Sequence, residues 1–141
     1  MTFLDTNVFI YAAGRESDYK PSCTQILADV VRGNLAAAVS SEVCQEIAYI
    51  YHRRQRSDLA IEVVRRVLKM PLTVLLVGRA EMETAVGIYA DKQAAGLRPR
   101  DAVHAAVMKQ NGISRVISTD PHFGLLDGIE RVDPRDYGGA R

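Results

Sequence analysis

The sequence predicts a three-layer α/β/α fold around a mostly parallel central sheet of about five strands. Short apolar runs of β type alternate along the chain with longer segments of helical periodicity. Most runs are about 30 or more residues apart, the length of a helical crossover between parallel strands. They are also too short and too apolar for half-exposed antiparallel strands. The runs are residues 3–4, 35–39, 72–77, 115–118 and, more weakly, 129–132.

The first two long helices are predicted from their start and stop signals. One is expected over residues 19–32, with Pro21 in its first turn and Gly33 as a C-terminal stop. The next is expected over residues 42–54, with the serine at position 40 or 41 as its N-cap. Its apolar stripe has the spacing of one helical face and consists of Val43, Ile47 and Ile50. Both helices therefore connect neighbouring strands of the predicted sheet.

A third long helix is expected to begin at a cap formed by Ser57 or Asp58. Its apolar residues Ile61, Val64 and Leu68 keep helical spacing. We expect this stripe to face the core.

The last two long helices are delimited by glycine and proline. One is expected over residues 79–95 and stops at Gly96. The other begins after Pro99 and ends at Asn111 and Gly112. Each precedes a predicted strand or follows one, as the alternating α/β order requires.

Length and composition limit the class of protein. The 141 residues fit one domain, expected over residues 1–141, and 48% hydrophobic with 25% charged residues exclude a wholly disordered chain. No apolar run reaches the roughly 18 residues of a membrane span, and Asp5 interrupts the N-terminal apolar segment where a signal peptide would need continuity. The net charge of +1 excludes a whole-molecule attraction to nucleic acid. Cys23 and Cys44 are interpreted as reduced thiols, so we expect a cytoplasmic location.

Four acidic residues lie where a predicted strand ends or a helix begins. Asp5 closes the first strand, and Asp120 follows the fourth. Glu46 lies one turn inside the helix after the second strand, and Asp101 opens the last long helix. In an open parallel sheet, ligands bind in the crevice at the carboxyl ends of the strands. We therefore expect these four acids to meet at one crevice.

Such a cluster needs a compensating charge, because neighbouring carboxylates repel one another at neutral pH. A divalent cation would supply it. Oxygen ligands without a His/Cys pattern favour Mg²⁺ or Mn²⁺ over Zn²⁺. Mg²⁺ binds through a few carboxylates together with substrate phosphate, which suits phosphodiester chemistry.

Each acid also has a structural interpretation, which stays open at this stage. Asp5, with Thr6 and Asn7, can cap a short helix that begins near Val8, and Asp101 can be a first-turn acid favoured by the helix dipole. Glu46 lies past the capping turn beside an inward-facing apolar stripe, which favours a functional role. Glu42, in the first turn of the same helix, is only a second-choice ligand.

The residues around these acids resemble the PIN domain family, and within it the VapC-like toxin ribonucleases of type II toxin–antitoxin systems. The resemblance covers essentially the whole chain. Its motifs are Leu4-Asp5-Thr6-Asn7-Val8, Ser40-Ser41 followed by Glu46-Ile47, Asp101-Ala102-Val103-His104-Ala105-Ala106, and Ser118-Thr119-Asp120-Pro121-His122-Phe123. Each motif is weakly specific, and their order and spacing make the set specific.

The resemblance implies a PIN-like fold and an Mg²⁺- or Mn²⁺-dependent endoribonuclease. Its catalytic and metal-binding residues would be Asp5, Glu46, Asp101 and Asp120. Asp5 and Asp101 would be the principal ligands, Glu46 a ligand directly or through water, and Asp120 a supporting or second-metal ligand. A metal-activated water would then attack an RNA phosphodiester in line, leaving 5′-phosphate and 3′-hydroxyl ends.

The resemblance also implies supporting residues and partners. Asn7 and Ser118 match polar positions that support the cluster by hydrogen bonding. Many members have an acid directly before the phenylalanine of the last motif, where this chain has His122, so a second metal site is less expected than the first. The implied partners are an RNA substrate, a small cognate antitoxin and a second copy of the chain in a homodimer, with no membrane.

Basic residues and the histidine of the third motif have two interpretations. Arg98 and Arg100 beside Asp101 are expected to bind RNA at the mouth of the crevice. The basic run at residues 52–56 could do the same, but we favour a solvated helix end that complements the dipole. His104, three residues after Asp101, is expected to be a structural, hydrogen-bonded histidine.

Rival functions make different demands on the sequence. A haloacid-dehalogenase-type phosphatase needs a second acid two residues after Asp5, where this chain has Asn7. A receiver-like domain needs paired acids after the first strand and a lysine after a late one, and the sequence has neither. The remaining alternative is a non-catalytic PIN-like scaffold that binds RNA or a partner protein, and it differs from a nuclease in needing no metal.

Overall fold

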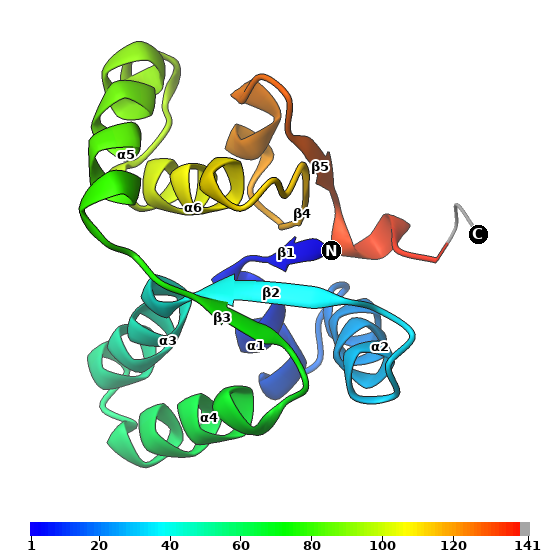
Figure 1. Cartoon of the computed structure of the whole chain (residues 1–141). Coiled ribbons are helices and arrows are strands. Elements are labelled where there is room, and N and C mark those ends of the chain that lie inside the picture. Colours follow the sequence, from blue (N-terminus) through cyan, green and yellow to red (C-terminus); the bar gives the residue numbers. More distant parts are fainter. Residues whose placement is uncertain (139–141) are drawn as a thin grey trace.

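A parallel five-stranded sheet forms the centre of the computed structural model, which describes residues 1–138 (Figure 1). The strand order is β3-β2-β1-β4-β5, and all four pairings are parallel. The strands are β1 (Thr2–Leu4), β2 (Ala37–Ser40), β3 (Thr73–Leu75), β4 (Arg115–Ile117) and β5 (Glu130–Val132). The predicted α/β fold with a parallel sheet is therefore confirmed.

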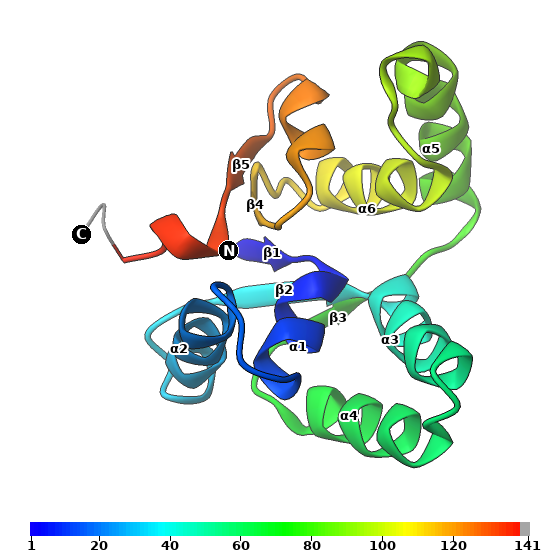
Figure 2. The same cartoon turned by 180° about the vertical axis from the view of Figure 1, so that it is seen from behind.

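Helices cover both faces of this sheet, so that the fold has three layers. Helices α1 to α4 lie on one side and α5 and α6 on the other (Figures 1 and 2). The six α-helices are α1 (Thr6–Ala13), α2 (Lys20–Val31), α3 (Ser41–Arg53), α4 (Ser57–Lys69), α5 (Arg79–Lys92) and α6 (Pro99–Gln110). Short 3₁₀ helices are η1 (Gln93–Ala95), η2 (Pro121–Leu125) and η3 (Pro134–Asp136).

The strand order places a topological switch point beside β1. The chain leaves β1 towards β2 on one side, whereas β4 pairs with β1 on its other side. At such a point, the connections after neighbouring strands diverge and leave a crevice at the carboxyl ends of the strands. The segments after β1, β2 and β4 all border this crevice.

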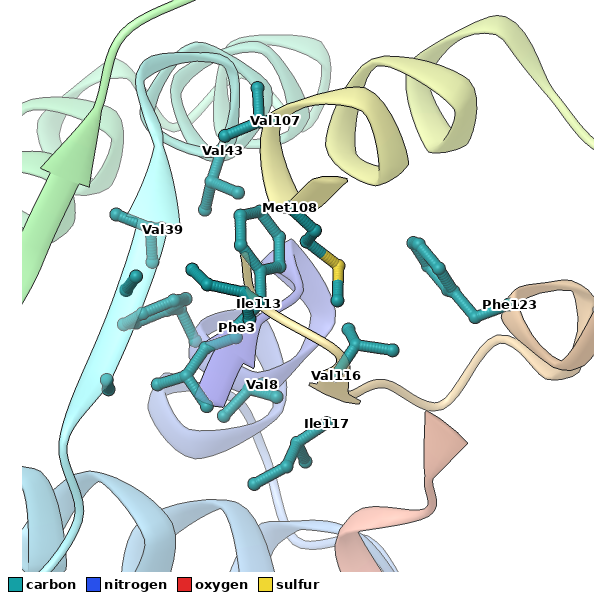
Figure 3. Close-up of a cluster of buried hydrophobic side chains, with 14 of the residues drawn as sticks. Phe3, Val8, Val39, Val43, Val107, Met108, Ile113, Val116, Ile117 and Phe123 are labelled. Carbon is teal, nitrogen blue, oxygen red and sulfur yellow. The ribbon is translucent and has the colours of Figure 1, made fainter. Parts of the chain in front are cut away.

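The core fills the space between the central strands and the helices. Every residue of β1 and β2 is buried, as expected for parallel strands covered on both faces. Phe3, Val39 and Val116 pack beside Val43 and Met108 in the same cluster (Figure 3). This close-packed core determines where the strands end and so positions the residues that follow them.

The prediction for α4 is wrong about which face is buried. Val63 and Val67 lie in the core, whereas Ile61 is 54% and Leu68 57% exposed. Both stripes satisfy helical spacing, because apolar residues occupy more than half the circumference of this helix. Periodicity alone therefore cannot choose between them.

The helix caps agree with the prediction at α3 and differ at α4. Ser40 caps α3, because its Oγ accepts a hydrogen bond from the Val43 N–H at 3.2 Å. At α4 neither predicted residue is the cap. The N-cap position is Arg56, without a side-chain capping bond.

The remaining expectations concern the cysteines, membrane spans and domain organisation. Cys23 is buried and Cys44 half-buried, and both are free thiols. Within residues 1–138, none of the helices has the length and apolar character to cross a membrane. The single domain expected over residues 1–141 stays a prediction, since residues 139–141 lie outside the described part of the chain.

Candidate active site

The four predicted acids lie together around one small cavity at the switch point. Its volume is about 30 Å³, more than the roughly 10–15 Å³ that a single water needs. Its lining residues come from four separate segments and are Asp5, Thr6, Asn7, Glu46, Ile50, Arg100, Asp101 and Asp120. The cavity is thus lined by acids that follow β1 and β4, by one from the second turn of α3 and by one from the first turn of α6.

Asp5 is held in place from two sides. It follows β1 directly and is the N-cap of α1, where its Oδ1 accepts from the Thr6 N–H at 2.8 Å. Its Oδ2 accepts from the Ser118 hydroxyl at 2.6 Å, across a sequence separation of 113 residues. The capping and clustering interpretations of Asp5 therefore both hold, and only 4% of its surface is exposed.

Glu46 accepts hydrogen bonds at both carboxylate oxygens. The Thr6 hydroxyl donates to Oε2 at 2.7 Å. His104 Nε2 lies 3.0 Å from Oε1, and because a carboxylate can only accept, Nε2 is the protonated nitrogen of that pair. Burial raises the pKa of Glu46, but the hydrogen bond and positive charge of His104 outweigh it and leave the pKa below its usual value.

His104 is buried completely and connects α3 and α6. Its Nδ1 lies 3.2 Å from the Ser40 hydroxyl, and its Nε2 is also 3.9 Å from Asp5 Oδ1. Burial lowers its pKa, but Glu46 and Asp5 outweigh that effect and raise it above the usual value. It is hydrogen-bonded as expected, and in addition it contacts the acids directly.

Asp101 is the acid with the least satisfied carboxylate. Only 3% of its surface is exposed, and among residues 1–138 its Oδ2 has no hydrogen-bond partner. Burial raises its pKa to about 6, assisted by the nearby charges of Asp120 and Asp5. A buried acceptor without a donor is costly, so this oxygen needs a cation or a proton.

Asp120 lines the cavity and is half-buried. Its Oδ1 accepts from the His122 backbone N–H at 2.9 Å and lies 2.7 Å from His122 Nδ1. The other side of the His122 ring faces Gly96, where an added Cβ would lie 3.0 Å from Nε2. Gly96 has φ +103°, so both the backbone and the space favour glycine there.

The cluster fits a divalent cation. A carboxylate oxygen of Asp5 and one of Glu46 lie within 4.8 Å of each other, and the unpartnered Asp101 Oδ2 belongs to the same cavity. Burial raises the pKa of Asp5 as well, although His104 and Ser118 counteract part of this. Carboxylate oxygens are the ligands that Mg²⁺ and Mn²⁺ prefer, and one bound cation would relieve the repulsion among them.

The other predicted site residues differ in whether they line the acidic cavity. Asn7 lines the cavity, and Ser118 bonds to Asp5 and accepts from the Asp120 N–H at 3.0 Å. Arg100 lines the cavity, whereas Arg98 is exposed outside it. Glu42 is half-buried and does not line the cavity.

The sequence does not predict two contacts of the site, the hydrogen bond from Thr6 to Glu46 and the contact of His104 with Glu46. Thr6 directly follows Asp5, so a hydroxyl beside an expected ligand was an available signal. His104 lies one helical turn after Asp101, which places both on the inward face of α6. Its bond to Glu46 depends on how α3 and α6 pack, and periodicity does not supply that information.

Comparison with known proteins gives a consistent result. The family model described as PIN domain matches residues 2–129. Ribonuclease VapC7 of Mycobacterium tuberculosis is 32% identical over 135 residues, which is 95% of this chain and 92% of the relative. Ribonuclease VapC13 of the same organism is 28% identical over 132 residues, 94% of this chain and 99% of the relative.

Solved structures with the same fold have lower sequence identity. The M. tuberculosis toxin VapC20, described as cleaving the sarcin–ricin loop, matches with a TM-score of 0.76 and 18% identity over 89% of this chain and 94% of that one. The VapBC complex of Salmonella typhimurium bound to DNA matches with a TM-score of 0.70 and 20% identity over 94% of this chain and 97% of that one. These likenesses show the fold.

Proposed function

The chain belongs to the PIN domain family, and we propose that it is a metal-dependent endoribonuclease, the toxin of a toxin–antitoxin pair. The observation that carries the proposal is the buried Asp101 Oδ2, which lacks a donor and lies in a cavity shared with three further carboxylates. The 32% identity to a protein named as a ribonuclease over nearly the whole chain supports the reaction class.

Asp5, Glu46, Asp101 and Asp120 would hold the cation, and their hard oxygen atoms suit Mg²⁺ or Mn²⁺. When bound, such a cation supplies Lewis-acid chemistry: it lowers the pKa of water and stabilises negative charge on a phosphodiester during in-line displacement. The repulsion among the four carboxylates is offset only while the cation is bound.

The side chains of the protein orient this chemistry. Thr6 and Ser118 fix the two oxygens of Asp5, while Thr6 and His104 fix those of Glu46. Because these donors are already in place, the ligand oxygens need little reorganisation when the site is loaded. Arg100 lines the same cavity, and its positive charge would attract the phosphate that is cut.

The same proposal includes partners and a location. A cognate antitoxin protein would block the site, and a structural relative described as a toxin–antitoxin complex from Klebsiella pneumoniae supports such a partner. We also propose a homodimer, and a cytoplasmic location in which RNA is available and both cysteines stay reduced.

The test is cleavage of a mixed pool of single-stranded and structured RNAs by the purified, partner-free protein. We expect cutting with Mg²⁺ or Mn²⁺, no cutting with a chelator, and a loss of at least about 100-fold in Asp5→Asn. Asp58→Asn removes an exposed carboxylate of α4 that is paired with Arg56 and should leave cleavage unchanged. RNA binding without metal-dependent cutting would contradict the proposal and favour a non-catalytic scaffold.

A further inference from the structure

A second cavity lies along the same pair of helices as the acidic one. It has a volume of about 310 Å³, within the range of roughly 300–1,000 Å³ for small-molecule sites. Its lining residues come from α1, the loop that follows it, and the end of α3, and they are Ile10, Tyr11, Gly14, Arg15, Ser17 and Arg54. Carboxylates line the first cavity, whereas two arginines and an aromatic ring line this one.

Helical spacing makes the two cavities neighbours. On α1, Asn7 lines the acidic cavity and Tyr11 the second one, a single turn later. On α3, Ile50 lines the acidic cavity and Arg54 the second one, again one turn later. A turn advances by about 5.4 Å, and both helices leave the same edge of the sheet (Figure 2). A single extended strand of nucleic acid that occupies the second cavity can therefore also reach the mouth of the acidic one.

The chemistry of the second cavity suits a nucleotide. Arg15 and Arg54 are exposed and form no ion pair within residues 1–138, so their guanidinium groups are available. The Arg54 guanidinium lies 5.8 Å from the centre of the Tyr51 ring, which restricts its position without neutralising its charge. Arginine is well suited to bind phosphate, because its planar group can donate two parallel hydrogen bonds.

An aromatic wall completes the site. Tyr11 is half-buried and its ring packs against Tyr19 with ring centres 4.8 Å apart, which restricts the orientation of the ring. Arg135 in turn lies 4.6 Å from the centre of the Tyr19 ring. An aromatic ring beside cationic groups is the combination that binds single-stranded nucleic acid, by stacking on a base while the arginines neutralise phosphate.

We propose that this cavity is a binding subsite for a nucleotide of single-stranded RNA next to the bond that is cut. Arg15 and Arg54 bind its phosphate, and Tyr11 stacks on its base. The inference rests on the proposed ribonuclease function and deepens it, because it identifies the side of the site along which the substrate continues. An acidic peptide would use the arginines, but an RNA strand also brings a phosphodiester to the cation that the four carboxylates would hold, so RNA is the occupant that both cavities favour together.

The experiment measures binding of a short, labelled, mixed-sequence single-stranded RNA to the full chain in the presence of chelator, so that no cutting occurs. Arg54→Ala should weaken binding by about 3- to 10-fold and reduce the slope of log K against log salt by about 0.7–1. Arg53→Ala is the matched control: it removes the same charge from the same turn of α3, but Arg53 does not line the cavity. Equal effects of the two variants would overturn the subsite.

A second pair of variants tests the base contact separately. Tyr11→Leu should weaken binding of intact RNA but not of a strand lacking bases, whereas Tyr11→Phe should behave as wild type. If Tyr11→Leu weakens binding of both strands equally, stacking on the base is overturned. Melting temperatures of each variant show that the chain is folded.

Two further outcomes distinguish this inference from the proposed function. If wild type binds no RNA in chelator but cuts RNA with metal, the subsite falls and the proposed function stands. If wild type neither binds nor cuts, both fall. An acidic peptide that binds through Arg54 while RNA does not would also overturn the subsite, in favour of a protein partner.

Discussion

Asp101 is the carboxylate whose negative charge destabilises the metal-free protein most directly, because its Oδ2 is buried without a donor. Its pKa is raised to about 6, chiefly by burial. The folded state therefore binds the proton of Asp101 more tightly than the unfolded state does. The unfavourable free energy is fully present above pH 6 and is relieved as the pH falls from about 6 towards the usual value of 3.8.

Asp101→Asn should accordingly stabilise the protein in chelator at pH 7, by roughly 1–3 kcal/mol. The difference between variant and wild type should shrink as the pH is lowered through about 6, because wild type then gains a proton. Denaturant unfolding at a series of pH values measures both effects. A variant less stable than wild type at pH 7 would mean that Asp101 has a stabilising partner.

His104 stabilises the metal-free protein in the opposite way, because it supplies a donor to a buried carboxylate. His104→Leu keeps an apolar contact with Phe3 but leaves Glu46 Oε1 without that donor. We expect a loss of about 2–4 kcal/mol in the free energy of unfolding. Adding Glu46→Leu should recover part of this loss, because the unpaired charge is then removed.

Chemical denaturation of the two single variants and the double variant gives the coupling between His104 and Glu46 directly. Additive losses would show that the two side chains do not interact. That outcome would remove the structural reason for placing His104 in the site.

These single residues also show what the sequence could reveal about the site. The positions of Asp5, Glu46, Asp101 and Asp120 relative to predicted strands were sufficient to bring them together, because parallel strands end at one edge. The bonds of His104 were not predictable. They depend on the distance between α3 and α6, which is set by side-chain packing rather than by local pattern.

At the level of elements, the end of α3 carries backbone strain. Gln55 has φ +58°, a left-handed conformation that favours glycine. Around it, the Gln55 N–H donates to the His52 carbonyl at 3.0 Å and the Arg56 N–H to the Tyr51 carbonyl at 2.9 Å, the pair of bonds of a Schellman motif. This turn directs the chain from α3 into α4 and fixes the residue before it, Arg54.

Gln55→Gly should therefore raise the stability by about 0.5–1 kcal/mol, because glycine adopts this conformation without the Cβ penalty. Gln55→Ala keeps the Cβ and should stay close to wild type. Melting temperatures of the three proteins measure the effect. A destabilised glycine variant would indicate that the Gln55 side chain has a favourable interaction that outweighs the strain.

The positions of the helices and strands were largely predictable, whereas the face that each helix buries was less so. The strands were found because they are short, apolar and separated by helical lengths, and Gly33, Gly96 and Gly112 all follow helix ends as expected. The buried face of α4 was not found. Its two apolar stripes compete, and only packing in the folded protein, which places α4 against α3, selects Val63 and Val67.

For the whole molecule, strand order is the feature that assembles the acidic site. With β1 between β2 and β4, four acids separated by up to 115 positions in the sequence border one cavity. The same arrangement lets α1 and α3 run side by side from that cavity to the arginine-lined one. The net charge of +1 conceals this separation of acidic and basic surfaces, which a nuclease needs for its cation and its substrate.

The central claim is that Asp5, Glu46, Asp101 and Asp120 form a centre for a divalent cation. Calorimetric titration of Mn²⁺ into the metal-free protein tests it most directly. We predict saturable binding to wild type and to Asp58→Asn, and loss of that binding in Asp5→Asn. Undiminished binding in Asp5→Asn, or no binding by folded wild type, would contradict the account.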